Sequence, residues 1–591
     1  MAKAKTAENQ KKTSNSNSKT AKLASTKAAQ KKSKTKVIPK GKTRKPKVEK
    51  TISLESILMN CRNALRGKIG GNDTNRDAVM TLTFLKFVGD KFEKRRKEIE
   101  EKYAKDKEYC KIQVETVAQY ISENVFYIPK HARWSNIVEN ASKNEIAVIL
   151  DKALKDIQEK NPALSGALPT NFYTTNLGGL TKELKKLIDE VNRIDETQFV
   201  DKDLIGRVYE YFLQAFSIDS TGKENGEFYT PANIVELITE LIEPYDGVVY
   251  DPCCGSGGMF VQSIKFVERH QGNKKKISVR GQESNPDTWR LAILNLAIRG
   301  ISHDLGTKAV STFSEDLHTA DKHRDHPFAD FIMANPPFNL KGWRGENELL
   351  TDPRWYPAYQ IPPVSNANYA WILHMLSKLD TQNGIAGFLL ANGALNAGKG
   401  KEGEKDEVEF EIRKQLIDND KIEAIIVLPR DMFYSVDLST TLWILNNNKK
   451  AHERNGRKLR DRRNEILFID LRRWDENIMK DNNGSGGSTK FVILSEEQIV
   501  KVRHIYFSWQ TDIDYTDIDE LCMSATLEQI KTQKYSLAPS KYIKFVDRDL
   551  DIDYETEMKR IQAEMKDILT VEVKSQDLLK TAFDGIGYGI N

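Results

Sequence analysis

The stretch Gly247–Phe260 reads GVVYDPCCGSGGMF and decides the fold. Its first half predicts a short buried strand that ends at Asp251. Its second half turns through Gly255, Gly257 and Gly258 into a helix. Glycines at such a turn let the backbone approach a ligand that side chains would block. The stretch therefore predicts the first strand, turn and helix of an α/β domain, with a ligand at the turn.

Residues 206–475 continue to alternate between strand and helix patterns. ISVRGQE predicts a strand ending at Glu283, KAVSTFSED a strand ending near Asp316, and FADFIMANPPF a strand ending before two prolines. IAGFLLAN and IEAIIVLP predict two more strands, and TTLWILNN and EILFIDLRR are candidates for an antiparallel pair. Such alternation is typical of a mainly parallel sheet covered by helices, which binds ligands beyond the carboxyl ends of its strands.

Helical periodicity dominates residues 51–205, for which we expect an α-helical N-terminal domain. AVMTLTFLKFVGDKFEKRRKEIEEKY predicts a long helix with Leu85, Val88 and Phe92 on one face. A shorter helix precedes it and ends in the glycines of LRGKIGG. The apolar residues at helical spacing in this shorter helix are Leu54, Ile57, Leu58, Cys61 and Leu65.

Charge is distributed unevenly along the chain. Residues 1–50 hold 17 Lys/Arg and 2 Glu, a net charge of +15, whereas the rest holds 73 Lys/Arg and 83 Asp/Glu, a net charge of −10. The first 50 residues have few large apolar groups, so burial cannot offset their ordering entropy, and we expect a disordered, Lys-rich basic tail. This tail either attracts DNA phosphates regardless of sequence or is solvated without a specific role.

Composition excludes several classes of protein. No apolar run approaches the roughly 18 residues of a membrane span, and no apolar segment follows the N-terminal charges as in a secretory signal. The 5 cysteines show no metal-ligand spacing, and Cys253 and Cys254 are adjacent. We therefore expect a cytoplasmic protein that contacts no membrane and binds no metal.

Two segments outside this pattern have open interpretations. KKAHERNGRKLRDRR (449–463) is either the solvated tip of a hairpin or a contact with phosphates. Residues 476–591 form a C-terminal region ending in a predicted partner-binding helix with a short heptad-like seam, whose packing partner is either this chain or another. The seam consists of Tyr554, Met558, Ile561, Met565 and Ile568.

Polar residues at the predicted strand ends fit an adenosine-containing cofactor. Glu283 lies 28 residues after Gly255, and its carboxylate can accept both ribose hydroxyl protons. Asp316 can accept a hydrogen bond from an adenine amino group. Upstream, GEFYTP (226–231) offers an aromatic pair and a hydroxyl before a helix; by itself it predicts an N-cap at Thr230 followed by proline.

The segment FIMANPPFNLKGW (331–343) presents a stiff bend at a strand end. The Asn335 side-chain carbonyl and the Pro336 backbone carbonyl can accept both hydrogens of an exocyclic amino group. The nitrogen lone pair, otherwise delocalised into the ring, then becomes available to an electrophilic methyl group. Phe338 offers a flat face on which an extruded base can stack.

These motifs together resemble those of S-adenosylmethionine-dependent amino-methyltransferases. More narrowly, the chain resembles the modification subunits of type I restriction-modification systems, which are adenine-specific DNA methyltransferases. The resemblance covers roughly residues 52–545. Its motifs are LRGKIGG…FLKFVGDKF, GRVYEYFLQAF, GEFYTP, DPCCGSGGMF, QESNP, ANPPFN, NYAWILHMLSKL, GIAGFLLANGAL, IEAIIVLPRDMFYSVDLSTTLWILNNNKK and YSLAPSKYI.

The resemblance implies a Rossmann-like catalytic domain that transfers methyl groups from S-adenosylmethionine to adenine N6 in DNA. The implied catalytic loop is Asn335, Pro336, Pro337 and Phe338. The implied cofactor site is Glu227, Phe228, Tyr229, Thr230, Pro231, Ala232, Asp251, Gly255, Ser256, Gly257, Gly258, Glu283 and Asp316. The implied partners are double-stranded DNA, a specificity subunit that reads the site and binds two modification subunits, and a restriction motor subunit that can join.

Two other functions fit parts of the sequence. One is an amino-methyltransferase acting on cytosine N4 or on protein glutamine, since a planar amide poses the same electronic problem. Cytosine enzymes more often carry Ser in place of Asn335, and the glutamine enzymes lack the GEFYTP block and the long helical front. The other is a non-catalytic scaffold that binds DNA, against which the intact Asn335, Phe338 and glycine turn argue.

Overall fold

A computed structural model gives the structure of the chain. It describes residues 53–68, 71–194, 204, 207–209, 211–212, 230–319, 329–396, 407–433, 439–481, 489–546 and 553–585. The basic tail of residues 1–50 and the cofactor candidates Glu227, Phe228 and Tyr229 lie outside these ranges.

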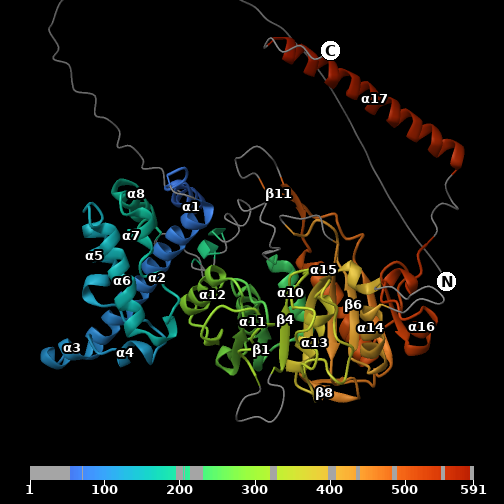
Figure 1. Ribbon diagram of the computed structural model, residues 1–591, viewed down its shortest axis with the longest axis horizontal. Helices are drawn as coiled ribbons and strands as arrows, with labels where there is room; N and C mark the ends of the chain where they lie inside the picture. Colours follow the sequence, from blue (N-terminus) through green and yellow to red (C-terminus); the bar gives the residue numbers. More distant parts are fainter. Residues whose placement is uncertain are drawn as a thin grey trace, which may run out of the picture. The chain divides into compact units, whose positions relative to one another are not determined.

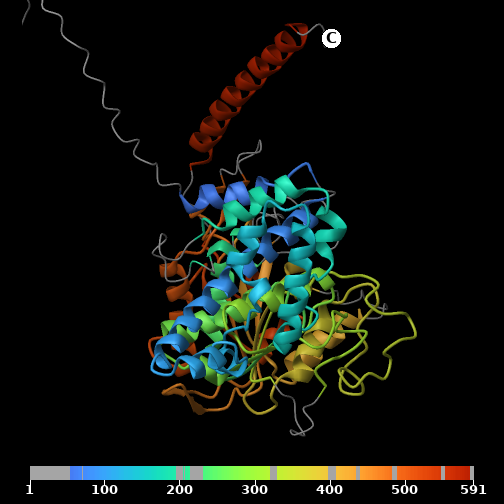
Figure 2. The same ribbon diagram turned by 90° about the vertical axis from the view of Figure 1, so that its left-hand side faces the viewer.

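The N-terminal region is helical, as the periodicity predicts (Figures 1 and 2). Helix α1 (Leu54–Asn63) follows Ser53, whose side chain accepts a hydrogen bond from the Ser56 backbone N–H. The five apolar residues predicted for it and for its C-terminal turn are buried. Helix α2 (Asn72–Lys102) buries Leu85, Val88 and Phe92. The other helices are α3 (Lys107–Gln113), α4 (Ala118–Ile121), η1 (Lys130–Ala132), α5 (Trp134–Asn140), α6 (Ile146–Lys160), η2 (Pro162–Leu164), α7 (Phe172–Leu177) and α8 (Thr181–Val191).

Within the described residues, nine strands form one sheet in the order β13-β10-β6-β7-β5-β4-β1-β2-β3. Strands β7 and β13 run antiparallel to their neighbours, and the other pairs are parallel. The predicted pairing of TTLWILNN with EILFIDLRR is wrong, because β6 lies between β7 and β10. The strands are β1 (Gly247–Asp251), β2 (Ile277–Gly281), β3 (His303–Asp304), β4 (Phe331–Ala334), β5 (Ile385–Ala391), β6 (Ile422–Val427), β7 (Thr440–Asn446), β10 (Glu465–Asp470) and β13 (Cys522–Thr526).

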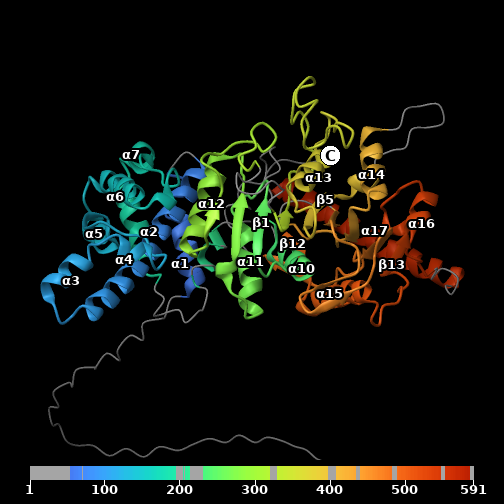
Figure 3. The ribbon, with the colours of Figure 1, turned by 90° about the horizontal axis from the view of Figure 1, so that it is seen from below.

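Helices cover both faces of this sheet, as predicted for an α/β fold. Figure 3 shows α10, α11 and α15 on one side of the strands and α13 and α14 on the other. Alternate strand residues feed two apolar cores: Met333 and Leu389 belong to the first, and Ile332 and Phe388 to the second. The helices of this region are α10 (Ala232–Ile242), α11 (Gly258–Arg269), η3 (Lys274–Lys276), α12 (Pro286–Ile298), α13 (Asn368–Lys378), η4 (Asn392–Asn396), α14 (Val408–Asp418), α15 (Glu496–Thr511), α16 (Leu527–Thr532) and η5 (Pro539–Lys541).

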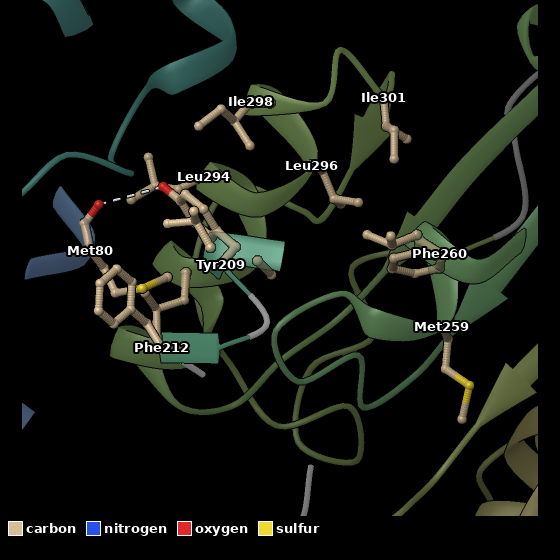
Figure 4. Close-up of a cluster of buried hydrophobic side chains, with 14 of the residues drawn as sticks. Met80, Tyr209, Phe212, Met259, Phe260, Leu294, Leu296, Ile298 and Ile301 are labelled. Carbon is tan, nitrogen blue, oxygen red and sulfur yellow. Dashed lines mark hydrogen bonds between the residues drawn. The ribbon is translucent and has the colours of Figure 1, made fainter. Parts of the chain in front are cut away.

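The first core continues into the N-terminal helices. Tyr209 and Phe212 are fully buried, and Figure 4 shows them between Met80 of α2 and Leu294 and Ile298 of α12. The Tyr209 hydroxyl donates to the Met80 carbonyl at 3.5 Å. Helix α12 therefore joins the helical region to the sheet, and its Asn295 and Leu296 lie beside the glycine turn.

The third predicted strand, KAVSTFSED, is wrong. The strand at this place is β3 (His303–Asp304), and residues 308–316 form a loop with a turn. The buried Gln282 side chain donates to the carbonyls of Val310 and Glu315 at 3.1 and 2.7 Å. A side chain thus satisfies backbone groups that a neighbouring strand would otherwise pair.

The basic segment 449–463 forms the predicted hairpin, with an exposed tip at Asn455 and Gly456, but several of its cationic side chains bind other parts of the fold. It contains the hairpin of β8 (His452–Arg454) and β9 (Arg457–Leu459). Arg454 donates to the Ile242 carbonyl at 2.9 Å, and Arg457 pairs with Glu243 at the end of α10. Lys449 pairs with Asp420, and the fully buried Arg462 pairs with Glu423 at 2.9 Å.

The sheet extends past residue 475, because β13 forms its edge and α15 packs on α10. A second hairpin joins β11 (Ile478–Asp481) to β12 (Thr489–Val492). Helix α17 (Tyr554–Gly585) contains the predicted seam and buries none of its residues. None of the helices in the described ranges combines the length and hydropathy that a membrane span requires.

Candidate active site

The glycine turn after β1 forms as predicted. Gly255 and Gly257 have φ angles of +53° and +81°, in the left-handed region that favours glycine. A Cβ added at Gly255 or Gly258 would meet no atom within 4 Å, so the backbone is open to a ligand there. The Asn295 side chain, from α12, donates to the Ser256 carbonyl at 2.7 Å and fixes the turn. Sequence analysis missed Asn295.

Glu283 lies at this turn, as the adjacency of two parallel strands predicts. Asp251 of β1 pairs with Gly281 of β2, which brings Glu283 back to the glycines. Its Oε2 accepts the Gly255 N–H at 3.0 Å, and its Oε1 accepts the Asn285 N–H at 2.8 Å. Each carboxylate oxygen keeps acceptor capacity for a ligand hydroxyl.

Asp251 lies beneath the turn. Its side chain is 1% exposed, and Oδ1 accepts the Cys253 backbone N–H at 3.0 Å. Burial, with a smaller contribution from the nearby charge of Glu283, raises the pKa of this carboxyl to about 7. This position favours support of the turn over direct contact with a ligand.

Asp316 lies on the loop beyond β3 rather than at a strand end. The Val310 N–H donates to the Glu283 carbonyl at 3.0 Å, which places this loop beside the ribose candidate. Asp316 Oδ1 accepts the His318 N–H at 3.1 Å, and Oδ2 pairs with the buried Lys378 of α13. Sequence analysis missed Gln282 and Lys378. Only Lys378 had a signal in the sequence, because it is the one lysine of an otherwise apolar helix and lies at its end.

Asn335 follows β4 and meets the start of α10. Its Nδ2 donates to Thr230 Oγ1 at 2.9 Å, although 105 residues separate the two. Its Oδ1 is buried and has no hydrogen-bond partner among the described residues. A buried acceptor without a partner costs about 1–3 kcal/mol, so this oxygen is a candidate for ligand binding.

Thr230 does not cap α10, contrary to the simplest interpretation of GEFYTP. The N-cap is the buried Pro231, and Ala232 is the first helical residue. No side chain caps the helix, because the Thr230 hydroxyl binds Asn335 instead. The Thr230 hydroxyl thus links the GEFYTP segment to the Asn335 loop.

Phe338 and the residues after it are held rigidly. Its ring packs edge-on against Phe433, with ring centroids 6.4 Å apart and planes at 90°. Asn339 has a φ of +54°, its N–H donates to Asn368 Oδ1, and Asn368 Nδ2 donates back to Asn339 Oδ1, both at 2.9 Å. Sequence analysis missed Phe433 and Asn368.

The described residues contain no group of three or more His, Cys, Asp or Glu arranged to hold a metal ion. Of the predicted cofactor residues, Thr230 to Ala232 lie beside Asn335, and Gly255 to Gly258 and Glu283 form the turn. Asp316 follows on the adjacent loop. All of these lie at the carboxyl edge of the sheet, where α/β folds bind ligands.

The chain is similar to known proteins over most of its length. Residues 200–549 match the N-6 DNA Methylase family, and residues 54–192 match the HsdM N-terminal domain. The methylase subunit of the type I restriction enzyme HindI from Haemophilus influenzae is 35% identical over 484 residues, 78% of this chain and 100% of that protein. The MjaIX methylase subunit from Methanocaldococcus jannaschii is 33% identical over 555 residues, 91% of this chain and 92% of that protein.

A solved structure shares the fold. The type I restriction-modification methyltransferase subunit from Streptococcus thermophilus superposes with a TM-score of 0.65 at 22% identity. The match covers 83% of this chain and 98% of that chain. The predicted fold class, an S-adenosylmethionine-dependent methyltransferase domain with a helical N-terminal region and a C-terminal helix, is thereby confirmed.

Proposed function

The chain belongs to the N-6 DNA methylase family, and we propose that its Asn335 loop carries out the reaction. The chain is an adenine-N6 DNA methyltransferase, the modification subunit of a type I restriction-modification system. The observation that carries the proposal is the Asn335 amide, whose nitrogen is fixed by Thr230 while its buried oxygen has no partner among the described residues.

The glycine turn and its neighbours fit S-adenosylmethionine. The open backbone at Gly255 and Gly258 admits a ligand, and the nearby acceptors are carboxylates. When bound, the cofactor supplies an electrophilic methyl group on its sulfonium. Glu283 accepts the ribose hydroxyl protons, and Asp316 accepts from the adenine amino group. Lys378 and the His318 N–H hold the Asp316 carboxylate in place for this contact.

The chemistry at Asn335 follows from its position. The target amino group is a poor nucleophile, because its lone pair is delocalised into the adenine ring. Asn335 Oδ1 accepts one amino hydrogen, and the Pro336 carbonyl accepts the other. Two fixed acceptors favour a pyramidal nitrogen, whose freed lone pair would be available to the methyl group that a bound cofactor would supply. The methyl–sulfur bond would break as the nitrogen–carbon bond forms, the sulfur would leave as a neutral thioether, and one amino proton would be lost to solvent. Because the bend is rigid, the acceptors need no reorganisation as charge develops.

The adenine reaches this site by leaving the duplex. Extrusion costs stacking energy, and stacking on an aromatic ring recovers about 1–3 kcal/mol. Phe338 provides that ring, and Phe433 fixes its orientation. We assign Phe338 to the base and the glycine turn to the cofactor.

Other subunits complete the activity. We propose that a specificity subunit reads the DNA site and binds two copies of this chain, and that a restriction motor subunit can join. The exposed seam of α17, with Met565 at 61% and Ile568 at 66% exposure, is the surface proposed for the partner. Because the substrate is DNA, we place the reaction in the cytoplasm.

Product analysis tests the proposed reaction. The complex with its specificity subunit should convert duplex adenine to N6-methyladenine, as measured by mass spectrometry of the digested DNA. Asn335→Ala should abolish the product while calorimetry still shows cofactor binding. Asn347→Ala, the same change at an exposed position of the following loop, should keep wild-type activity. N4-methylcytosine or methylated protein would identify a different acceptor, and absent cofactor binding would identify a scaffold.

A further inference from the structure

Asn233 carries a second unpaired polar atom near Asn335. It lies in the first turn of α10, three residues after Thr230. Its Oδ1 accepts the Ile234 backbone N–H at 3.0 Å, which orients the amide. Its Nδ2 is buried and, within the described part of the chain, has no acceptor. A buried donor that the fold leaves unsatisfied points to a ligand.

The two unpaired atoms lie on segments that meet at Thr230. Thr230 Oγ1 binds Asn335 Nδ2 at 2.9 Å, so the start of α10 adjoins the catalytic loop. Three residues span at most roughly 11 Å, which keeps Asn233 within reach of whatever Asn335 binds. Asn335 offers an acceptor and Asn233 a donor, and neither bonds to the other.

Adenine has the matching pattern. Its amino group donates, and the ring nitrogens on either side of that group, N1 and N7, accept. Guanine and thymine place a carbonyl oxygen where adenine has the amino group, and that oxygen would face Asn335 Oδ1 without a proton between them. A donor beside Asn335 therefore suits a base that carries an amino group next to a ring acceptor.

We propose that Asn233 is a base-recognition residue, whose Nδ2 donates to N1 or N7 of the adenine that Asn335 binds through its amino group. This inference rests on the proposed function and adds to it a residue that reads the ring. It separates two roles within the site: Asn335 activates the amino nitrogen, and Asn233 orients the ring.

Atom-by-atom substitution of the base tests this assignment. Three duplexes carry adenine, 1-deazaadenine or 7-deazaadenine at the target position, and single-turnover methylation is measured with the assembled complex. Asn233→Asp keeps the shape and the Ile234 contact but replaces the donor with an acceptor. An acidic residue is favourable in the first turn of a helix, so the variant should fold. Asn233→Ala removes the donor without adding charge.

The expected result is non-additive. Both variants should slow methylation of adenine by about tenfold, the factor expected when a hydrogen bond of this kind is lost. With the deaza base that lacks the recognised nitrogen, wild type should be slowed similarly, and the variants should add less than about twofold. Affinity for S-adenosylmethionine, measured by calorimetry, should stay within about twofold of wild type.

Two outcomes would overturn the assignment. An equal loss on all three duplexes would make Asn233 a structural residue, and a tenfold loss of cofactor affinity would assign its amide to the cofactor. Both leave the proposed function intact, because wild type still methylates adenine. If the proposed function itself is wrong, the wild-type complex will form no N6-methyladenine, and this result is distinguishable from both outcomes above.

Discussion

The two ends of the active site differ in how they satisfy their polar groups. On the cofactor side, both oxygens of Glu283 and both oxygens of Asp316 have partners within the chain. On the acceptor side, Asn335 Oδ1 and Asn233 Nδ2 are buried without a partner in the described ranges. The cofactor side therefore satisfies its carboxylates within the chain, whereas the acceptor side keeps two buried polar atoms unpaired among the described residues.

We therefore expect the paired carboxylates of the cofactor side to stabilise the fold, and the unpaired atoms of the acceptor side to contribute free energy only when a ligand binds. Removing a satisfied carboxylate from the cofactor side leaves its donors unpaired and should destabilise the fold. Removing one of the acceptor-side amides costs a single native hydrogen bond, to Thr230 for Asn335 or to Ile234 for Asn233, but it also removes a buried atom that has no partner in the described residues. The two effects oppose each other, so stability should change little while activity falls. Active sites that hold such unsatisfied groups exchange stability for function.

The largest effect that tests this comparison is expected for Glu283→Ala. It removes the two proposed ribose contacts and the acceptors for the Gly255 and Asn285 N–H groups. Hydrogen bonds to charged groups contribute about 1.5–3 kcal/mol each, so calorimetry should show cofactor affinity reduced by about 100-fold or more. The melting temperature should also fall. An unchanged affinity would remove Glu283 from the ribose role.

Asp251→Asn should change stability in a pH-dependent way. The folded carboxyl has a pKa of about 7, above its ordinary 3.8, because it is buried. The folded state therefore holds this proton more tightly than the unfolded state, and wild-type stability should fall between about pH 4 and pH 7. The variant keeps the acceptor for Cys253 but cannot ionise. Urea unfolding should show it gaining a few kcal/mol over wild type at pH 8, relative to the difference at pH 4. A constant difference would contradict the assigned burial.

Phe338→Ala should lower transfer by about 10- to 100-fold through lost stacking, with cofactor affinity unchanged. The loss should shrink when the target adenine lies opposite an abasic site, because such a base is already partly unstacked. Single-turnover rates on the two duplexes measure this. An equal loss on both would indicate that Phe338 acts on the loop rather than on the base.

Deletion of residues 1–50 should produce the smallest effect. If the tail contacts phosphates, its loss reduces the slope of log affinity against log salt, with little change in transfer rate at saturating DNA. Filter binding of the assembled complex over a range of salt concentrations gives this slope. An unchanged slope would support a solvated tail without a DNA contact.

The sequence predicted which residues meet because neighbouring strands end side by side. It did not predict the hydrogen bonds that buried side chains make to distant loops. Glu283 could be placed at Gly255 because consecutive parallel strands end at one edge. Gln282, Asn295 and Lys378 bind backbone or charged atoms of remote loops, and no periodicity indicates such partners. The prediction of a third strand at 308–316 was wrong for this reason, because the Gln282 side chain makes hydrogen bonds to this loop where a neighbouring strand would otherwise make them.

The order of the outer strands in the sheet could not be predicted from local sequence patterns either. Strand β7 inserts between β5 and β6, and β13 joins β10 from 52 residues beyond its end (Asp470 to Cys522). Arg457 and Glu243, which fasten a hairpin to α10, lie 214 residues apart. The composition of the basic segment therefore suggested contact with solvent or phosphate, although four of its eight Lys/Arg pair with acidic residues elsewhere in the fold.

The most direct test measures methyl transfer and melting temperature on the same Asn335→Ala complex with cofactor bound. Our account predicts transfer about 1,000-fold below wild type, with cofactor affinity intact and a melting temperature close to that of wild type, because loss of the Thr230 hydrogen bond is offset by removal of the unpaired buried oxygen. Transfer near the wild-type rate would contradict the assignment of Asn335 to the amino group. Lost transfer together with a melting temperature lowered by more than one hydrogen bond can explain would contradict the claim that this oxygen is unpaired in the fold and available to the base.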